Sequence, residues 1–190
     1  MIKNLLLILL VTQLSSCAVL HEEYFYPQAI GAKVEKQSCR GKVGVDNQLV
    51  FQFDDVKLNL EVWEYQDITR LGIGFKVYGQ ANVVWPKQIV NISFGEIRQE
   101  LEVEFFTRLR FENRYQSNEL SKKEYTANSI MDRTTDEEYE SYSGTFTITD
   151  GKATQLRVEG IRVLVNGKKH ILPEAVFTKK DGLFLHPLNC

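Results

Sequence analysis

The sequence has no marked excess of charge of either sign. Its 190 residues include 23 lysines and arginines against 25 aspartates and glutamates, so the formal net charge is −2. A protein that binds nucleic acid through its surface field carries a basic patch or stripe, and none is visible here. The composition therefore argues against nucleic acid as a partner, and against any partner selected by bulk charge.

Motifs for catalysis and cofactor binding are also missing. The chain has no nucleophile elbow, phosphate-binding loop, dinucleotide fingerprint or helical zinc-protease motif. Its only histidines, His21, His170 and His186, have no second metal ligand at a characteristic spacing. The acidic runs at residues 54–55 and 136–140 do not follow calcium-loop spacing. We therefore expect no catalytic residue, no metal site and no cofactor.

No apolar run is long enough to cross a membrane as a helix, which takes about 20 residues. The short apolar run at the N-terminus covers residues 5–11, with Lys3 before it and the small residues Ser15 and Ser16 after it. A cation, an apolar core and small residues are the three parts of an export signal. Residues 1–16 are therefore predicted to be a signal peptide that is removed.

The residues at the end of this segment, Leu14-Ser15-Ser16-Cys17, resemble the lipobox of bacterial lipoproteins. The resemblance covers only residues 1–17. It implies that the Cys17 thiol receives a diacylglyceryl group, that the chain is cut before Cys17, and that the new amino end is acylated. An ordinary secretory signal with a cysteine at this position is the alternative.

Lipidation decides location, because each buried methylene contributes about 0.8 kcal/mol and two or three acyl chains together hold a protein on a membrane. Among Gram-negative lipoproteins, an aspartate just after the cysteine tends to retain the protein in the inner membrane. Ala18 and Val19 stand there in this chain. The resemblance therefore implies a lipid anchor in the outer membrane with the domain facing the periplasm. A lipoprotein on the surface of a Gram-positive cell is the alternative.

Once Cys17 is assigned to the lipid, Cys39 and Cys190 remain as an even pair in an oxidising compartment. We expect a disulfide between them, because terminal residues fray and a covalent link explains a C-terminal cysteine better than packing does. Closing so long a loop contributes on the order of 5 kcal/mol in the chain-entropy description. An intermolecular bond or two free thiols are the alternatives that the sequence leaves open.

Much of the remaining chain alternates apolar and polar residues, which is the period of a β-strand with one buried face. This alternation predicts strands at residues 49–53, 56–62, 71–77, 90–94 and 101–111. The last run also has a helical spacing, but its Val, Phe and Thr content favours a strand. The predicted fold class is all-β, an antiparallel β-sandwich in which an immunoglobulin-like topology is plausible, with a barrel as second choice.

Three two-residue turn signals divide the C-terminal half: Asp150-Gly151, Asn166-Gly167 and Asp181-Gly182. Such pairs accept the positive φ angles that tight hairpins require. They are expected to join residues 145–149 to 154–158, residues 161–165 to 168–172, and residues 176–179 to 183–185.

Length and composition fit one β domain, residues 29–190, behind a tether at residues 17–28. The aromatic side chains of the tether, Tyr24, Phe25 and Tyr26, are expected either to dock on the domain or to lie at lipid headgroups.

A polar excursion at about residues 112–142 interrupts the alternation. Long excursions are uncommon in compact domains and are either functional or mobile. Ser121-Lys122-Lys123-Glu124 fits a capping box, which predicts a short helix. If the chain binds a partner protein, this segment is the first candidate, through Tyr115, Asp136, Glu137 and Glu138.

These features favour a lipid-anchored, non-catalytic protein that acts as an interaction or structural module in the cell envelope. Its partners would be the membrane and an envelope protein or a cell-wall component. The alternative is a module that binds a small molecule or a lipid in a cavity lined by Phe51, Phe53, Phe75 and Phe94. An envelope hydrolase is the third hypothesis, because catalytic sets can assemble from dispersed residues.

Overall fold

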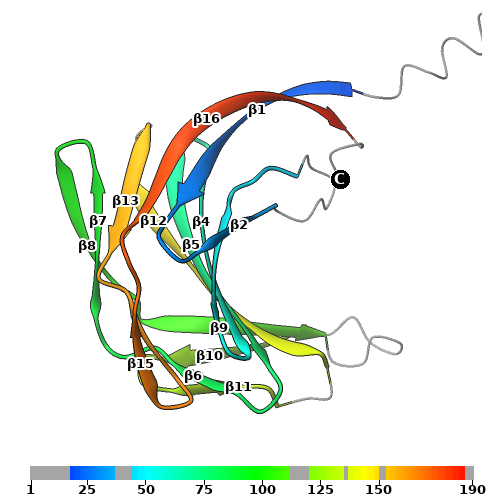
Figure 1. Ribbon diagram of the computed structural model, residues 1–190, viewed down its shortest axis with the longest axis vertical. Helices are drawn as coiled ribbons and strands as arrows, with labels where there is room; N and C mark the ends of the chain where they lie inside the picture. The colour runs from blue at the N-terminus through cyan, green and yellow to red at the C-terminus, as the bar shows by residue number, and fades with distance from the viewer. Residues whose placement is uncertain (1–17, 37–43, 112–119, 135–136, 150–152, 187–190) are drawn as a thin grey trace, which may run out of the picture.

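The computed structural model describes residues 18–36, 44–111, 120–134, 137–149 and 153–186. Within these ranges the chain forms strands, turns and irregular connections, and no helix. The strands pair antiparallel into three sheets that pack on one another (Figure 1). The protein is therefore all-β, with the architecture of a β-sandwich, as the alternation in the sequence predicts.

Two larger sheets form the faces of the sandwich. The five-stranded sheet has the order β1-β16-β13-β7-β8, with strands Ala18–Gln28, Ala175–His186, Gln155–Glu159, Ile89–Phe94 and Ile97–Glu102. The seven-stranded sheet has the order β10-β9-β12-β5-β4-β3-β2, with strands Leu120–Thr126, Phe105–Phe111, Tyr139–Thr149, Ile68–Tyr78, Val56–Tyr65, Gln48–Phe53 and Lys33–Glu35.

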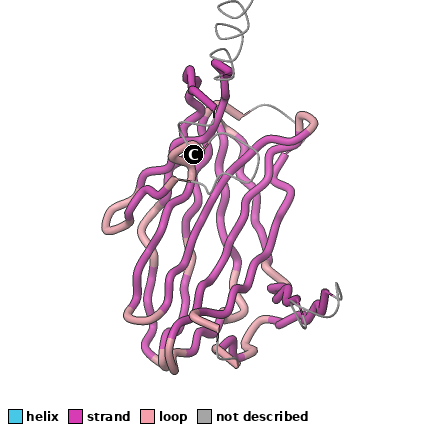
Figure 2. Tube along the Cα trace, turned by 90° about the vertical axis from the view of Figure 1, so that its right-hand side faces the viewer, coloured by secondary structure: helices cyan, strands magenta, loops and turns pink. Residues whose placement is uncertain are grey.

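A smaller sheet lies at the lower end of the molecule in Figure 1. Its order is β11-β6-β14-β15, with strands Ile130–Asp132, Asn82–Val84, Arg162–Val165 and Lys168–Ile171. Figure 2 shows the long strands of the sandwich running side by side along the long axis. Over the described residues no sheet closes on itself, so each sheet keeps two edge strands.

The hydrophobic core lies between the sheets and follows the period of two that the sequence shows. On β4, Val56, Leu58, Leu60 and Val62 are buried, while the residues between them are only half-buried. Three aromatic rings of the core, those of Phe75, Trp85 and Phe106, meet edge to face, with centroids 5.2, 5.3 and 6.2 Å apart. Edge-to-face pairs are a favourable geometry for buried rings.

The phenylalanines that the sequence analysis assigns to the wall of a ligand cavity belong to this core. Phe51 and Phe75 are fully buried, and Phe53 and Phe94 pack against the same cluster. They fill space between the sheets, so a ligand site must be sought elsewhere.

Residues 18–28, which the sequence analysis treats as part of a tether, form β1. This strand pairs with β16 over its whole length, from Ala18 opposite His186 to Gln28 opposite Val176. Phe25 is buried in the core, so the aromatic segment docks on the domain. The sandwich therefore begins at Ala18, because a long partner strand is available to satisfy the backbone groups of this segment.

The strand predicted over residues 101–111 is two strands in different sheets. β8 ends at Glu102 in the five-stranded sheet, and β9 begins at Phe105 in the seven-stranded sheet. Val103, between them, is buried, and the carbonyl of Glu104 accepts a hydrogen bond from the N–H of Ala127 at 3.2 Å. Apolar and polar residues keep alternating in the sequence across this crossover, so the sequence pattern does not indicate where the chain changes sheet.

The described parts of the polar excursion at residues 112–142 include strands β10, β11 and the start of β12. The short helix predicted at Ser121 is wrong, because residues 120–126 form β10 and pair in register with β9. Tyr125 on β10 is buried against Tyr142 of β12, with ring centroids 5.0 Å apart. Tertiary pairing thus overrides the local capping signal.

Of the three predicted hairpins, one is confirmed. Asn166 and Gly167 have φ angles of 50° and 77° and join β14 to β15. The hairpin at Asp181-Gly182 is wrong, since β16 runs straight through these residues and pairs them with Glu23 and Glu22 of β1. The runs on either side of Asp150-Gly151, which lies outside the described residues, also do not pair: β12 joins β5 and β9, whereas β13 joins β16 and β7.

Candidate functional site

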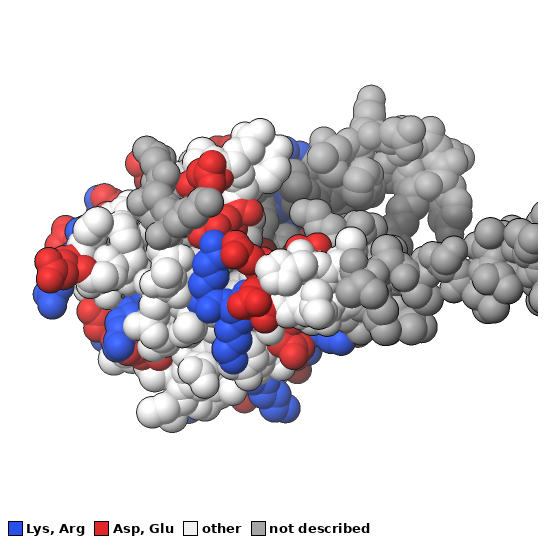
Figure 3. Space-filling model, turned by 90° about the horizontal axis from the view of Figure 1, so that it is seen from above, with Lys and Arg blue, Asp and Glu red and all other residues white. Residues whose placement is uncertain are grey.

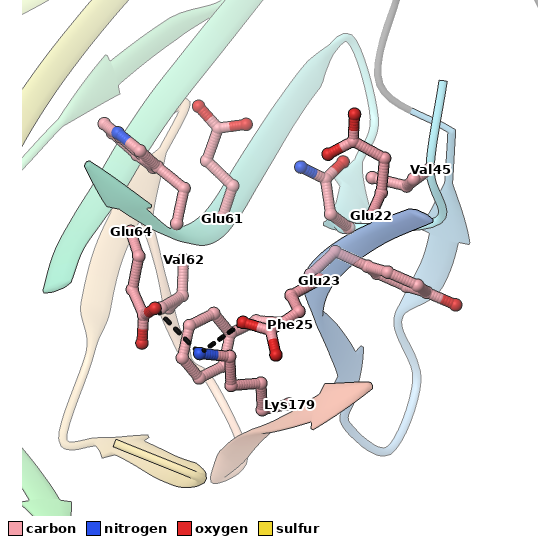
Figure 4. A pocket seen from close by; sticks show the side chains of 11 residues that line it. Glu22, Glu23, Phe25, Val45, Glu61, Val62, Glu64 and Lys179 are labelled. Atoms are coloured by element: carbon pink, nitrogen blue, oxygen red, sulfur yellow. Dashed lines mark hydrogen bonds and ion pairs between the residues drawn. The ribbon is translucent and has the colours of Figure 1, made fainter. Parts of the chain in front are cut away.

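A pocket of about 340 Å³ opens where the edge of the five-stranded sheet meets the seven-stranded sheet (Figure 4). Strands β1, β4 and β16 and the segment before β3 supply its walls. Its lining residues are Glu22, Glu23, Tyr24, Phe25, Val45, Asn47, Glu61, Val62, Trp63, Glu64 and Lys179.

The position of Lys179 follows from strand periodicity. On β16, Ala175 and Phe177 point into the core and are buried, and Lys179 is the next residue on the same face. Its partner across the sheet is Phe25 of β1, which is buried as well. The side chains on the core-facing side of β16 thus change from apolar, at Ala175 and Phe177, to cationic, at Lys179.

Lys179 bridges the two sheets. Its Nζ donates a hydrogen bond to Glu64 Oε2 on β4 at 2.8 Å and lies 3.0 Å from Glu23 Oε2 on β1. Figure 4 shows the ammonium between these two carboxylates. The hydrogen bond to Glu64 raises the pKa of Lys179 above its usual value; burial opposes this shift, and the hydrogen bond to Glu23 adds to it. Lys179 therefore stays protonated and acts as a cationic link, not as a base.

Glu61 is on β4, as Glu64 is, but has different neighbours. Its carboxylate points away from Lys179 in Figure 4 and accepts a hydrogen bond from Gln48 Nε2 at 3.3 Å. Burial raises the pKa of Glu61, while the hydrogen bond from Gln48 partly lowers it. Gly72 on β5 makes room for this arrangement, because a Cβ there would lie 2.8 Å from the Trp63 ring and 3.0 Å from Glu61 Cγ.

The charges of the pocket are unbalanced. The described lining residues include four carboxyl groups, those of Glu22, Glu23, Glu61 and Glu64, and one ammonium, that of Lys179, which bridges Glu23 and Glu64. Within the described residues, Glu64 Oε1 is buried and accepts no hydrogen bond. The described residues of the lining include no serine, threonine, cysteine or histidine. The pocket is thus suited to accept a cationic group or hydrogen-bond donors.

On the face that Figure 3 shows, the two charge signs are interleaved. Figure 3, which views the molecule from above, shows acidic and basic side chains next to one another, not in separate fields. The described part of the chain contains no group of three or more His, Cys, Asp or Glu residues placed to hold a metal ion. In the same residues, no helix has both the length and the apolar character needed to cross a membrane.

Comparison of the chain with protein-family models, with curated proteins and with solved structures finds no match.

The site residues predicted from the sequence are not brought together at the pocket. Cys17, Cys39, Cys190, Tyr115 and Asp136 lie outside the described residues. Glu137 and Glu138 are exposed beside the start of β12. The Glu137 carbonyl accepts a hydrogen bond from Arg133 Nη1 at 2.6 Å, and Arg133 Nε donates to the Gly79 carbonyl at 3.0 Å. Backbone contacts therefore hold this part of the excursion against the sandwich.

The histidines are dispersed. His21 on β1 lies 3.3 Å from Asp181 on β16, and both side chains are exposed. His170 on β15 packs its ring against Phe53, with centroids 4.5 Å apart. His186 is at the end of β16, and its side chain is outside the described residues. The two described side chains come from different sheets and have different neighbours.

The residues that line the pocket carry no recognisable site motif in the sequence. Glu64 and Lys179 are 115 positions apart, and no local pattern joins them. One signal was readable: Lys179 falls on the inward phase of an alternating run that also contains Ala175 and Phe177. A lysine at an inward position of a strand indicates a buried acidic partner, although the sequence does not identify it.

Proposed function

We propose that this protein is a lipid-anchored, non-catalytic lipoprotein of the outer membrane that acts as an interaction module in the cell envelope. The observation that carries the proposal is the continuity between the lipobox and the pocket. β1 begins at Ala18, directly after Cys17, and the same strand supplies Glu22 and Glu23 to the pocket. At about 3.3 Å per residue, these carboxylates are about 20 Å from Cys17 along the strand.

A lipid anchor on Cys17 would adjoin the first strand of the sandwich. Eleven residues of β1 pair with β16, so the first residues after Cys17 have little freedom to act as a flexible linker. Acyl chains on Cys17 would hold this edge of the sandwich close to the bilayer. The partner is therefore expected to meet the domain near the membrane.

The surface proposed for the partner is the acidic pocket. Glu23 has an exposed side chain, and Lys179 neutralises only part of the charge that the four carboxyl groups carry. A partner that presents a basic side chain or a free amine, on an envelope protein or a cell-wall component, has complementary charge. The contact would be charge-assisted and would weaken as the salt concentration rises.

Intact mass spectrometry of the mature protein, with and without reductant, tests both covalent assignments. We expect a chain that begins at Cys17 and carries acyl groups, and a gain of two hydrogen atoms when the reductant converts a Cys39–Cys190 disulfide to two thiols. A chain that begins at another residue, or that carries no lipid, would refute the anchor. An unchanged mass on reduction would refute the disulfide and leave the anchor standing.

Crosslinking in cells tests the pocket, with the excursion as its matched control. The variant Glu22→Gln/Glu23→Gln removes two neighbouring charges at the pocket, and Glu137→Gln/Glu138→Gln removes two at the excursion. Point substitutions are needed because deleting the excursion would remove β10 and β11, with buried Tyr125 and Met131. We expect the crosslinked partner to be lost from the first variant only. Loss from the second variant only would move the contact to the excursion.

The volume of the pocket supports a second candidate, a module that binds a small cationic molecule. Cavities of about 300–1,000 Å³ are typical of small-molecule sites, and this pocket measures about 340 Å³. Native mass spectrometry of detergent-extracted protein should then show a retained ligand that the Glu22→Gln/Glu23→Gln variant loses. Release of no ligand from the wild-type protein would reject this candidate.

A further inference from the structure

Strand β8 is an open edge of the five-stranded sheet. β7 pairs with it on one side, and no strand of the described chain lies on the other side (Figure 1). Phe94 and Ile97 close the two-residue turn between them and form a hydrogen-bonded pair. Because such pairs alternate along an antiparallel ladder, Arg98, Glu100 and Glu102 direct their backbone N–H and C=O groups outward. This row of backbone groups is a template for another strand.

The side chains of β8 alternate in character. Ile97, Gln99 and Leu101 stand opposite Phe94, Ile92 and Val90 of β7, and Ile92 and Val90 are buried, so this row faces the core side of the sheet. Ile97 is nevertheless 58% exposed, because the strand is at the rim. The other row, Arg98, Glu100 and Glu102, is exposed on the outer face and carries both charge signs.

We infer that β8 pairs antiparallel with β8 of a second copy of this chain, with Gln99 on the two-fold axis. In this register Arg98 lies opposite Glu100 of the second copy, and Glu100 lies opposite its Arg98. On the core side, Ile97 lies opposite Leu101 of the second copy. The two five-stranded sheets then join into one sheet of ten strands, 5 + 5.

The charges select this register among its neighbours. A shift by one residue would place the side chains of the two strands on opposite faces, so only shifts by two keep the core side common. An axis at Arg98 would set Arg98 against itself, and an axis at Glu100 would set Glu100 against itself. Like charges directly opposite each other are destabilising, whereas opposite charges are stabilising. Of the three axes near the middle of β8, at Arg98, Gln99 and Glu100, only the axis at Gln99 has a neutral pair at the centre and an opposite-charge pair on each side.

The other edge strands of the described chain fit a second copy less well. β15 carries Lys168 and Lys169 and would face its own positive charge. If two copies of β10 paired with Lys122 opposite Glu124, the two-fold axis would pass through Lys123 and set it opposite the Lys123 of the other copy. β2 and β11 have three residues each. β1 contains Pro27, which has no N–H to donate.

The association should be weak and concentration-dependent. Stable protein interfaces bury about 1,200 Å² or more, and one pair of six-residue strands covers less than that. A covalent trap at the axis is therefore the appropriate measurement. Two residues that face each other in a non-hydrogen-bonded pair have Cα atoms about 4.5 Å apart, which is within the range of a disulfide.

Three single substitutions by cysteine test the register in the full-length chain: Arg98→Cys, Gln99→Cys and Glu100→Cys. After mild oxidation with oxidised glutathione, we expect several-fold more covalent dimer from Gln99→Cys than from either neighbour or from wild type. The 99–99 link should be found by mass spectrometry. Equal yields from the three variants, or a maximum at Arg98→Cys or Glu100→Cys, would overturn the register.

Charge reversal tests the partner. In the Gln99→Cys background, Glu100→Arg should lower the dimer yield several-fold, because Arg98 would then face an arginine. Adding Arg98→Glu should restore the yield, because the pair returns with its signs exchanged. Both positions are exposed, so all variants should keep the wild-type circular dichroism spectrum. A yield that ignores the single reversal, or that the double reversal does not rescue, would refute pairing between two copies of β8.

Discussion

Replacing Lys179 by methionine should reveal how much the charged bridge at the pocket contributes to stability. The Lys179 side chain is 16% exposed and that of Glu64 is 20% exposed, so Lys179→Met leaves a mostly covered carboxylate without its cation. Breaking a fully buried pair costs about 3–5 kcal/mol. Because water still reaches part of this pair, we expect a loss of about 2 kcal/mol in the free energy of unfolding.

Urea unfolding followed by tryptophan fluorescence measures this loss, and two companion variants interpret it. Glu23 is 59% exposed, so Glu23→Gln should cost less than about 1 kcal/mol. The double variant Lys179→Met/Glu64→Gln should be more stable than Lys179→Met alone, because it no longer contains the unpaired carboxylate. A loss in Lys179→Met no larger than in Glu23→Gln, or a double variant less stable than the single one, would refute the reasoning.

The same bridge predicts a dependence on alkaline pH. Its hydrogen bond to Glu64 raises the pKa of Lys179 above 10.5 in the folded state, with burial acting in the opposite direction. A cation with a raised pKa contributes fully to stability while it is protonated in both states, and this contribution is lost as the pH rises through the folded-state value. The stability difference between wild type and Lys179→Met should thus stay constant from neutral pH to about pH 10 and shrink above it.

Three further substitutions test other parts of the structure. Burial raises the pKa of Glu61, so its ionised form destabilises the folded state. Glu61→Gln should therefore be more stable than wild type at pH 7, and equally stable below the usual carboxyl pKa of 4.5. Urea titrations at the two pH values measure this difference, and a wild type more stable than the variant at pH 7 would contradict it. Trp85→Ala removes a 1% exposed ring from the core and should cost about 3–5 kcal/mol; a calorimetric loss below about 1 kcal/mol would contradict the packing. Asn166 has a φ of 50°, and its Oδ1 accepts a hydrogen bond from the Asn82 N–H at 3.0 Å. Asn166→Ala should therefore lower the free energy of unfolding by about 1–2 kcal/mol, and Asn166→Gly should lower it by less. Equal losses in the two variants would show that the backbone angle is unimportant.

Local sequence patterns predicted those strands whose alternation and turn chemistry agree. β4 shows this most clearly, because Val56, Leu58, Leu60 and Val62 have one face in common and all four are buried. The Asn166-Gly167 turn was equally readable, since this pair tolerates the positive φ angles that its hairpin requires. In both cases the pattern that predicts the structure spans only a few neighbouring residues.

Predictions failed where a segment's partner is distant in sequence. Residues 18–28 lack the clean alternation of a strand, yet they become one because β16, about 150 residues away, offers a paired edge. The same pairing keeps β16 straight through Asp181-Gly182, and pairing with β9 turns the capping box at Ser121 into part of a strand. Long-range hydrogen bonding outweighs local propensity in each of these segments.

The sequence by itself determined the nearly balanced charge and the all-β fold of this protein, because these properties depend on composition and on short-range periodicity. The export signal and the lipid anchor at Cys17 stay predictions from the first residues of the sequence. Only the tertiary structure decided that Glu23, Glu64 and Lys179 meet in one pocket and that β8 remains an open edge. These properties depend on which strands become neighbours, and burial of the whole chain's apolar faces selects those neighbours.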